Sequence, residues 1–317
     1  MCKVSVVIPN YNGSKYLKDC LESLNAQTFR DFEVIFVDNG STDDSLELLA
    51  RYCSNARAER LSENFGFCKA VNIGVGLSRA PYVLLLNNDT RAMPDFIQRL
   101  VETMEENPRC FSCAAHMYKM ADPEKTDDAG DFFCALGWAF SRGKDKPVSD
   151  YQKPGKIFAA CAGAAIYRRE LMVKLGLFDE RHFAYLEDID LGYRARVEGY
   201  ENRFEPSAVV YHVGSGTTGS RYNEFKVRYS ARNNLYLIYK NMPLFQLILN
   251  APLLLLGFGT KLVFFSLKGY GGEYRKGLAL GAELVKTGKK YPFRWKNLGH
   301  YLKIQAELWK NIVLRFR

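Results

Sequence analysis

Short apolar runs rich in β-branched residues alternate, over the first 90 residues, with segments in which leucines recur at helical spacing. The runs are VSVVIPN at 4–10, VIFV at 34–37 and VLLL at 83–86, and each predicts a buried strand. Between the first two, Leu17, Leu21 and Leu24 mark one face of a helix. Further helices are expected from about residue 43 and, after a loop, within 63–78. The alternation predicts an α/β fold, with a mostly parallel sheet and helices on both faces.

The second half of the chain is less regular. Residues 119–157 are rich in charge, Gly and Pro, which predicts irregular structure over a cleft. A strand and then a helix are expected within 157–170, and a strand is expected to end at His212. The pattern changes near residue 240, so we expect a body at 1–240 and a helical extension at 241–317.

The net charge of +9 is concentrated in that extension. Residues 261–317 hold 13 of the 44 Lys and Arg but only 3 of the 35 Asp and Glu, so the rest of the chain is close to neutral. A basic tail can bind nucleic acid, but no nucleic-acid-binding motif accompanies this one. The hydrophobic fraction of 47% excludes a wholly disordered chain.

An apolar segment, 243–269, lies beside the basic tail. Gln246, Asn250, Pro252 and Lys261 interrupt it, whereas a membrane-spanning helix needs about 20 nearly uninterrupted apolar residues. The segment therefore predicts a helix on a membrane surface, where flanking basic and aromatic residues meet the headgroups. Packing against the protein's own body or against a second copy of the chain are the alternatives.

The eight cysteines are scattered along the chain. Only Cys110 and Cys113 form a CxxC pair, and no second pair completes a zinc site. Free thiols in a reducing cytoplasm are therefore expected. The apolar run at the N-terminus lacks a cleavage-site pattern, so it predicts a strand and not a signal peptide.

Polar residues follow the predicted strands, at the sheet edge where ligands bind in α/β folds. Asp38 can accept the imide N–H of uracil or thymine, or it can cap the following turn. Asp89 can bind Mg²⁺ or Mn²⁺ on a diphosphate, or it can form part of a turn. His212 can be a second metal ligand or a structural histidine.

Three carboxylates, Glu187, Asp188 and Asp190, fall within four residues and are followed by Arg194. In a helix that starts here, Glu187, Asp190 and Arg194 share a face, and Asp188 is free to face the cleft. A carboxylate near an acceptor hydroxyl can remove its proton during attack on an anomeric carbon. Such a base, opposite the leaving group, gives a single displacement with inversion. The helix dipole alone also favours acidic residues in a first turn.

Together these segments resemble family 2 glycosyltransferases of the GT-A (Rossmann-like) fold, particularly their bacterial rhamnosyltransferase-like branch. The resemblance covers about residues 3–240 and implies a nucleotide-binding half at 1–110 and an acceptor-binding half at 111–240. It rests on six segments in the same order: VSVVIPNYNGSKYLKDCLESLNAQT, VDNGSTDDS, ENFGFCKAVNIG, LLLNNDT, GAAIYRRELMVKLGLFDERHFAYLEDIDLGYRA and YHVGSGT.

The resemblance also implies roles for single residues. Asp188 would be the general base, and Asp89 and His212 would bind a divalent metal, Mg²⁺ or Mn²⁺. The residues implied for the donor nucleotide are Pro9, Tyr11, Asp38, Asn64, Gly66, Asn72 and Asn88. Those implied for support of the acceptor or active site are Gly163, Glu187, Asp190, Arg194 and Trp138. Two positions depart from the family's metal motif, because Asn87 and Asn88 leave Asp89 as its only carboxylate, which implies a weaker metal site.

The implied reaction transfers L-rhamnose from dTDP-rhamnose to a lipid-linked saccharide of a cell-surface polysaccharide. The enzyme would be peripheral at the cytoplasmic face of the plasma membrane, and its extension would bind the membrane or join two copies. UDP-hexose and UDP-galactofuranose donors stay open, because no residue separates them from dTDP-rhamnose. A nucleotidyltransferase would carry a glycine-rich phosphate loop, which residues 9–20 lack. A non-catalytic binding protein would have lost the carboxylates, and Asp38, Asp89 and Asp188 are in place.

Overall fold

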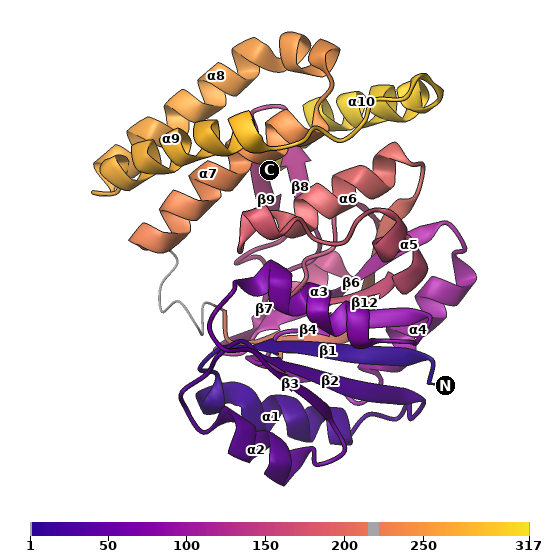
Figure 1. Ribbon diagram of the computed structural model, residues 1–317. Coiled ribbons are helices and arrows are strands. Elements are labelled where there is room, and N and C mark those ends of the chain that lie inside the picture. The colour runs from indigo at the N-terminus through magenta and orange to yellow at the C-terminus, as the bar shows by residue number, and fades with distance from the viewer. Residues whose placement is uncertain (1, 215–221, 317) are drawn as a thin grey trace.

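A ten-stranded mixed sheet forms the centre of the protein, whose computed structural model describes residues 2–214 and 222–316 (Figure 1). The strand order is β10-β12-β6-β11-β4-β1-β2-β3, with β5 paired to β12 and β7 paired to β6. The strands are β1 (Val4–Asn10), β2 (Phe32–Asp38), β3 (Arg57–Arg60), β4 (Tyr82–Leu86), β5 (Thr90–Ala92), β6 (Cys110–Lys119), β7 (Asp122–Asp128), β10 (Gly155–Ile157), β11 (Ala164–Arg168) and β12 (Glu201–His212).

The pairing is parallel in the first half of the chain and mixed in the second. β1 pairs in parallel with β2 and β4, and β2 pairs in parallel with β3. β11 lies antiparallel between β4 and β6. The predicted strands of the first half are confirmed. β3 was not predicted, because its sequence, RAER, is an exposed edge strand without apolar alternation.

Helices cover both faces of this sheet, as the sequence predicts. They are α1 (Ser14–Asn25), α2 (Ser45–Tyr52), α3 (Phe67–Leu77), α4 (Phe96–Glu106), α5 (Arg169–Lys174) and α6 (Glu187–Val197). Alternate residues of β1 point to opposite faces. Val6 belongs to the core beneath α1 and α4, and Val7 belongs to the core beneath α3 and α6. The three leucines of α1 are all buried, so its predicted apolar face is confirmed.

The expectation of irregular structure at 119–157 is wrong. This region contains β7, a hairpin of β8 (Asp131–Cys134) and β9 (Trp138–Ser141), a 3-10 turn η1 (Val148–Tyr151) and β10. The sequence of β7, DPEKTDD, carries no strand signal, and its pairing comes from β6. Backbone hydrogen bonding to an existing strand thus organises a segment that has almost no apolar side chains.

The C-terminal helices gather at the end of the molecule that lies opposite α1 and α2 (Figure 1). They are α7 (Glu224–Asn241), α8 (Leu244–Leu267), α9 (Gly271–Thr287) and α10 (Leu298–Arg315), with a short 3-10 turn η3 (Trp295–Asn297) before α10. α10 packs on the body, because the Ala135 amide donates to the Leu308 carbonyl at 3.0 Å. Arg196 of α6 and Glu307 of α10 form an ion pair. The extension therefore packs against the body, which is one of the alternatives expected from the sequence.

α8 buries two polar side chains and leaves several large apolar ones exposed. Its buried residues are Gln246, Asn250 and Gly257, whereas Leu255 is 76% exposed and Leu267 is 83% exposed. Among the described residues it is the one helix whose length and mean hydropathy of 1.8 would suffice to cross a membrane. That criterion is also met by core helices of soluble proteins.

Candidate functional site

Asn10, Asp38 and Asn88 meet at the carboxyl ends of β1, β2 and β4. The Asn10 amide donates to Asp38 at 3.2 Å and accepts from Asn88 at 2.5 Å. Asp38 is fully buried and also accepts the Ser41 amide at 3.2 Å. It therefore caps the turn as well as standing at the strand end, so both of its predicted uses are compatible with its position. Pro9 precedes this group, and Tyr11, 38% exposed, follows it.

The loop before α3 lies beside residues 178–183. Asn64 accepts hydrogen bonds from the Asn39 side chain and from the Gly66 amide, both at 2.9 Å. Gly66 has a φ of 90°, and a Cβ there would lie 2.5 Å from the Phe183 ring. Asn72 donates to the Phe178 carbonyl at 2.9 Å. The predicted nucleotide residues Gly66 and Asn72 thus also connect the two halves of the body.

Asp89 and His212 lie side by side. His212 Nε2 is 3.2 Å from an Asp89 oxygen, and His212 Nδ1 is 2.8 Å from Asp127. Asp127 also accepts from Lys144 at 2.7 Å. Burial opposes the charge on His212, but its bonds to Asp127 and Asp89 raise its pKa to about 9. Burial opposes the charge on Asp127 as well, but its bonds to His212 and Lys144 hold its pKa below the usual range.

This donor set fits a divalent cation. Nitrogen and oxygen donors approach one another, and metal-binding histidines commonly give their other ring N–H to a carboxylate. Asp127 is placed to accept that N–H from His212. A cation between Asp89 and His212 would displace the proton that His212 carries in its absence.

Asp188 stands in a cluster of acids at the start of α6. Its side chain accepts the Ile189 amide at 2.7 Å and is hydrogen-bonded to Asp131. Burial and the neighbouring Asp128 raise the pKa of Asp188 to about 6. Burial, together with Asp128 and Asp188, raises the pKa of Asp131 well above its ordinary value. Burial and the like charges nearby thus favour the protonated form of Asp131, beside a carboxylate, Asp188, whose pKa stays lower.

The other acids of this helix have different surroundings. Asp190 is fully buried and accepts from Arg194 at 2.6 Å, Lys240 at 2.8 Å and Asn241 at 2.7 Å. Burial opposes its charge, but Arg194 and Lys240 lower its pKa. Glu187 is buried, and desolvation with the nearby Asp188 raises its pKa well above its ordinary value. Asp190 thus ties α6 to α7, and Asp188 is the one of these three acids that is partly exposed.

Of the remaining predicted site residues, Gly163 lies near Asp188, whereas Trp138 lies against α8. The Gly163 carbonyl accepts the Asn87 amide at 2.9 Å, and the amide of its neighbour Ala162 donates to Asp188. Trp138 donates to the Gly257 carbonyl at 3.0 Å, and its ring centroid is 6.2 Å from that of Phe316. The structure thus brings Gly163 to the acidic cluster and places Trp138 in the packing of the C-terminal helices.

Residues that the sequence did not single out contribute to this site. Asp127, Asp128 and Asp131 lie in the region that was expected to be irregular. Asp128, Asp131 and Cys161 each place one donor atom within 4.8 Å of the other two. The run of acids DDAGD at 127–131 is the signal that could have identified them. Residues 215–217 of the predicted His-containing segment lie outside the described residues.

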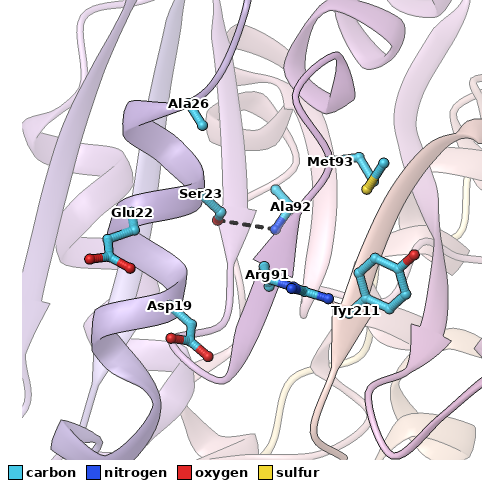
Figure 2. Close-up of a pocket in the computed structure, with 8 residues that line it drawn as sticks. All are labelled: Asp19, Glu22, Ser23, Ala26, Arg91, Ala92, Met93 and Tyr211. Atoms are coloured by element: carbon cyan, nitrogen blue, oxygen red, sulfur yellow. Dashed lines mark hydrogen bonds between the residues drawn. The ribbon is translucent and has the colours of Figure 1, made fainter.

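A hollow on the surface lies apart from these residues. Figure 2 shows it between α1 and the β5 region, where the Ser23 hydroxyl accepts the Ala92 amide at 3.1 Å. The guanidinium of Arg91 lies 4.8 Å from the centroid of the Tyr211 ring there. None of the predicted site residues lines this hollow.

Relatives of known name resemble large parts of the chain. An N-acetylglucosaminyl-diphospho-decaprenol L-rhamnosyltransferase of Mycobacterium tuberculosis is 27% identical over 239 residues, which cover 68% of this chain and 77% of that protein. Glycosyltransferase GlyG of Streptococcus pneumoniae is 31% identical over 106 residues, which cover 32% of this chain and 35% of that protein.

Solved structures share the fold at low identity. The mannosyltransferase PcManGT of Pyrobaculum calidifontis, in complex with GDP-Man and Mn²⁺, has a TM-score of 0.55 and 17% identity, covering 97% of this chain and 85% of that one. GalNAc-T7 with UDP, GalNAc and Mn²⁺ has a TM-score of 0.61 and 17% identity, covering 75% of this chain and 48% of that one. These likenesses confirm the GT-A fold.

The family model for "Glycosyl transferase family 2" matches residues 5–176, more than half of the chain. That range contains β1 to β4 with the polar residues at their ends, Asp89 and the acids of 127–131. The two relatives described above are named as a rhamnosyltransferase and a glycosyltransferase. The protein is therefore a glycosyltransferase, and the chain belongs to glycosyl transferase family 2.

Proposed function

We propose that this glycosyltransferase inverts the anomeric centre of its donor sugar, with Asp188 as the general base. The observation that carries the proposal is the state of Asp188 itself. It is partly exposed at the start of α6, and its pKa of about 6 lies just below neutral. A general base works best with a pKa close to the working pH, where it is ionised yet still holds a proton well.

The chemistry is a single displacement. The acceptor hydroxyl oxygen forms a bond to the anomeric carbon while the bond from that carbon to the diphosphate breaks. The bonding electron pair leaves with the diphosphate, and the hydroxyl proton passes to Asp188. The hydrogen bonds from the amides of Ile189 and Ala162 hold the carboxylate in place for this transfer.

Asp89 and His212 are the residues that would hold a divalent metal, Mg²⁺ or Mn²⁺. Such an ion would offset the negative charge that develops on the departing diphosphate. Asp127 orients His212, and Asn88 and Asn10 bond one another beside Asp89. The proposal is supported by the adjacency of the two donor side chains and by the Mn²⁺ in two structural neighbours.

We propose dTDP-rhamnose as the donor and a lipid-linked saccharide as the acceptor. The support is the mycobacterial relative, whose name describes rhamnosyl transfer to a decaprenol-linked acceptor. The second candidates are UDP-hexose and UDP-galactofuranose, and a structural neighbour in complex with UDP-GlcNAc favours a UDP-sugar. Thermal unfolding of the full chain with Mg²⁺ and each of dTDP-rhamnose, UDP-glucose, UDP-galactose and GDP-mannose separates them. We expect the largest stabilisation with dTDP-rhamnose, and a larger shift with a UDP-sugar would overturn that choice.

The role of Asp188 is tested with Asp188→Asn, which preserves shape and removes the base. Turnover should fall by about 10²–10⁴-fold, the usual contribution of a general base, while the Kd of the donor changes little. Asp150→Asn, on an exposed turn, is the matched control and should behave as wild type. Near-normal turnover of Asp188→Asn would reject the mechanism.

We also propose that the outer face of α8 rests on an anionic membrane surface, where the acceptor's lipid is anchored. Leu255, Leu256 and Val263 are all at least 60% exposed on this face. Residues 261–317 beside it are strongly basic, which complements an anionic headgroup layer. Exposed apolar area with flanking positive charge is the signature of helices that lie in the interface.

Sedimentation with vesicles of phosphatidylglycerol and phosphatidylcholine tests this surface. The full chain should sediment with the vesicles, and the double variant Leu255→Asp and Leu256→Asp should not. Val173→Asp, which changes an exposed valine on α5, is the control and should sediment. A full chain that stays in the supernatant, or that forms a dimer which the double variant abolishes, would contradict membrane binding.

A further inference from the structure

The segment that leads into Asp188 has an unusual backbone. Phe183, Tyr185 and Leu186 have φ values of 62°, 75° and 68°, in the region that favours glycine. Residues with side chains reach such conformations at a cost of order 1–3 kcal/mol each, and they keep them only where surrounding contacts hold them. The segment His182–Leu186 must therefore be held by something outside itself.

Asn233 of α7 supplies those contacts. Its side-chain amide nitrogen lies 2.8 Å from the His182 carbonyl, 2.8 Å from the Ala184 carbonyl and 2.9 Å from the Tyr185 carbonyl. Asn233 is fully buried. Three carbonyls of one strained turn thus share a single amide group as their donor.

The orientation of that amide is fixed from the other side. Arg232 donates to the Asn233 side-chain oxygen at 2.8 Å. Because arginine can only donate hydrogen bonds, it identifies this atom as the oxygen and leaves the NH₂ group facing the three carbonyls.

The segment His182–Leu186 also determines where α6 begins. The Leu186 carbonyl accepts the Asp190 amide at 3.0 Å, the first hydrogen bond of the helix, and Asp188 lies in that first turn. The Phe183 carbonyl accepts the Cys68 amide at 3.1 Å, so the same turn also contacts the start of α3. A change in the turn would rotate the first turn of α6 and move the Asp188 carboxylate.

We propose that Asn233 is a positioning residue, which holds His182–Leu186 so that Asp188 faces the acceptor hydroxyl. The inference rests on the proposed role of Asp188 as the base. It gives α7 a part in catalysis, although this helix lies outside the matched range of 5–176.

The test is Asn233→Asp. The new side chain has the same shape and keeps an oxygen for Arg232, but it presents an acceptor to the three carbonyls. The matched control is Asn234→Asp, the adjacent buried asparagine on α7, which donates instead to the Gly137 carbonyl at 2.7 Å. Turnover is followed as nucleoside diphosphate release from the donor, among the four named above, that wild type uses.

We expect kcat of Asn233→Asp to fall about 100-fold, the order of loss that a misplacement of about 1 Å produces. The KM of Asn233→Asp for the donor should stay within about twofold of wild type. Asn234→Asp should keep the kcat of wild type, even if its melting temperature falls as much as that of Asn233→Asp. Equal losses of kcat in the two variants, or no loss in Asn233→Asp, would overturn the proposal. If Asn233→Asp does not fold, Asn233→Ala replaces it with the same expected split between kcat and KM.

Asp188→Asn separates this inference from the mechanism on which it rests. If Asp188→Asn is active, the base assignment fails and the positioning role fails with it. If Asp188→Asn is inactive and Asn233→Asp turns over normally, only the positioning role is wrong.

Discussion

Asp188 and Asp190 stand two residues apart on one helix, yet their surroundings move their pKa values in opposite directions. Burial beside Asp128 raises the pKa of Asp188 to about 6. Asp190 is more deeply buried, but Arg194 and Lys240 reverse the effect of burial and lower its pKa. Local charge thus separates a carboxylate suited to proton transfer from one that stabilises the fold.

The pH dependence of activity follows from the raised pKa of Asp188. The base acts only when it is deprotonated, so activity should be constant above about pH 7. Below about pH 6 the carboxylate takes up a proton, and kcat/KM should fall about tenfold for each pH unit. Steady-state rates between pH 5 and 8, at saturating metal, measure the profile. Rates that stay constant down to pH 5 would show that a group of lower pKa is the base.

A second prediction at this scale concerns Asp127, which orients His212. Asp127→Asn should weaken metal binding by about 10–100-fold, the usual cost of losing the carboxylate partner of a metal-binding histidine. Titration calorimetry of the full chain with MnCl₂ measures the affinity directly, without the reaction. Asp122→Asn, at the start of β7 and with a side chain that is 44% exposed, is the control and should bind Mn²⁺ as wild type does. Equal affinities in the two variants would remove Asp127 from the metal site.

At the scale of elements, α8 shows how a helix can be held with its apolar face outward. Asn250 exchanges hydrogen bonds with Gln305 at 2.9 and 2.8 Å and accepts from Trp309 at 3.1 Å. Gln246 accepts from Tyr193 at 2.6 Å. Buried polar groups are costly to leave unpaired, so these bonds fix which side of the helix faces the protein and leave leucines such as Leu255 and Leu267 exposed.

The close approach of α8 to the β8–β9 hairpin depends on Gly257. A Cβ at this position would lie 2.0 Å from the Leu136 carbonyl oxygen, whereas a Cβ at Gly259 meets nothing within 4 Å. Gly257→Ala should therefore lower the free energy of unfolding by about 1–3 kcal/mol, as overpacking does. Gly259→Ala should be neutral or raise it by up to about 1 kcal/mol through helix propensity. Urea denaturation measures the free energy of unfolding of both variants. Equal values would contradict the close contact between Gly257 and Leu136.

At the scale of the whole molecule, the C-terminal helices complete the core of the body. Phe133, Phe158 and Tyr193 of the body form one buried cluster with Leu237 of α7 and Leu308 of α10. Lys240 of α7 bridges Asp179 and Asp190 at 2.8 Å each. The sequence pattern changes near residue 240, but residues on both sides of that point share one buried cluster.

A chain that ends after residue 242 would expose that cluster and leave the hairpin without α10. We expect it to unfold at a lower temperature than the full chain and to aggregate on heating. Scanning calorimetry of the full chain should show a single cooperative transition. Two transitions, with the truncated chain retaining the one at higher temperature, would show instead that the body folds independently.

The sequence predicted those elements whose apolar residues form a continuous run or recur at helical spacing. β1, β2 and β4 are buried at nearly every position, and α1 is buried on one face, so both patterns are visible in the letters alone. β3 and β7 escaped prediction because they are polar edge strands, which form only when a partner offers free backbone groups. The Glu-Asp-Ile-Asp segment was identified as a helix start, and α6 begins at Glu187.

The sequence by itself determined the family, the α/β class and the residues at the ends of the central strands, because these depend on local pattern and on order along the chain. Only the tertiary structure decided which acid has its pKa raised and which has it lowered. It also joined Asp127 to His212 across 85 residues and Asn233 to the turn before Asp188 across about 50. A pKa and a strained turn both depend on neighbours brought close by folding, and such neighbours leave no periodic signal in the sequence.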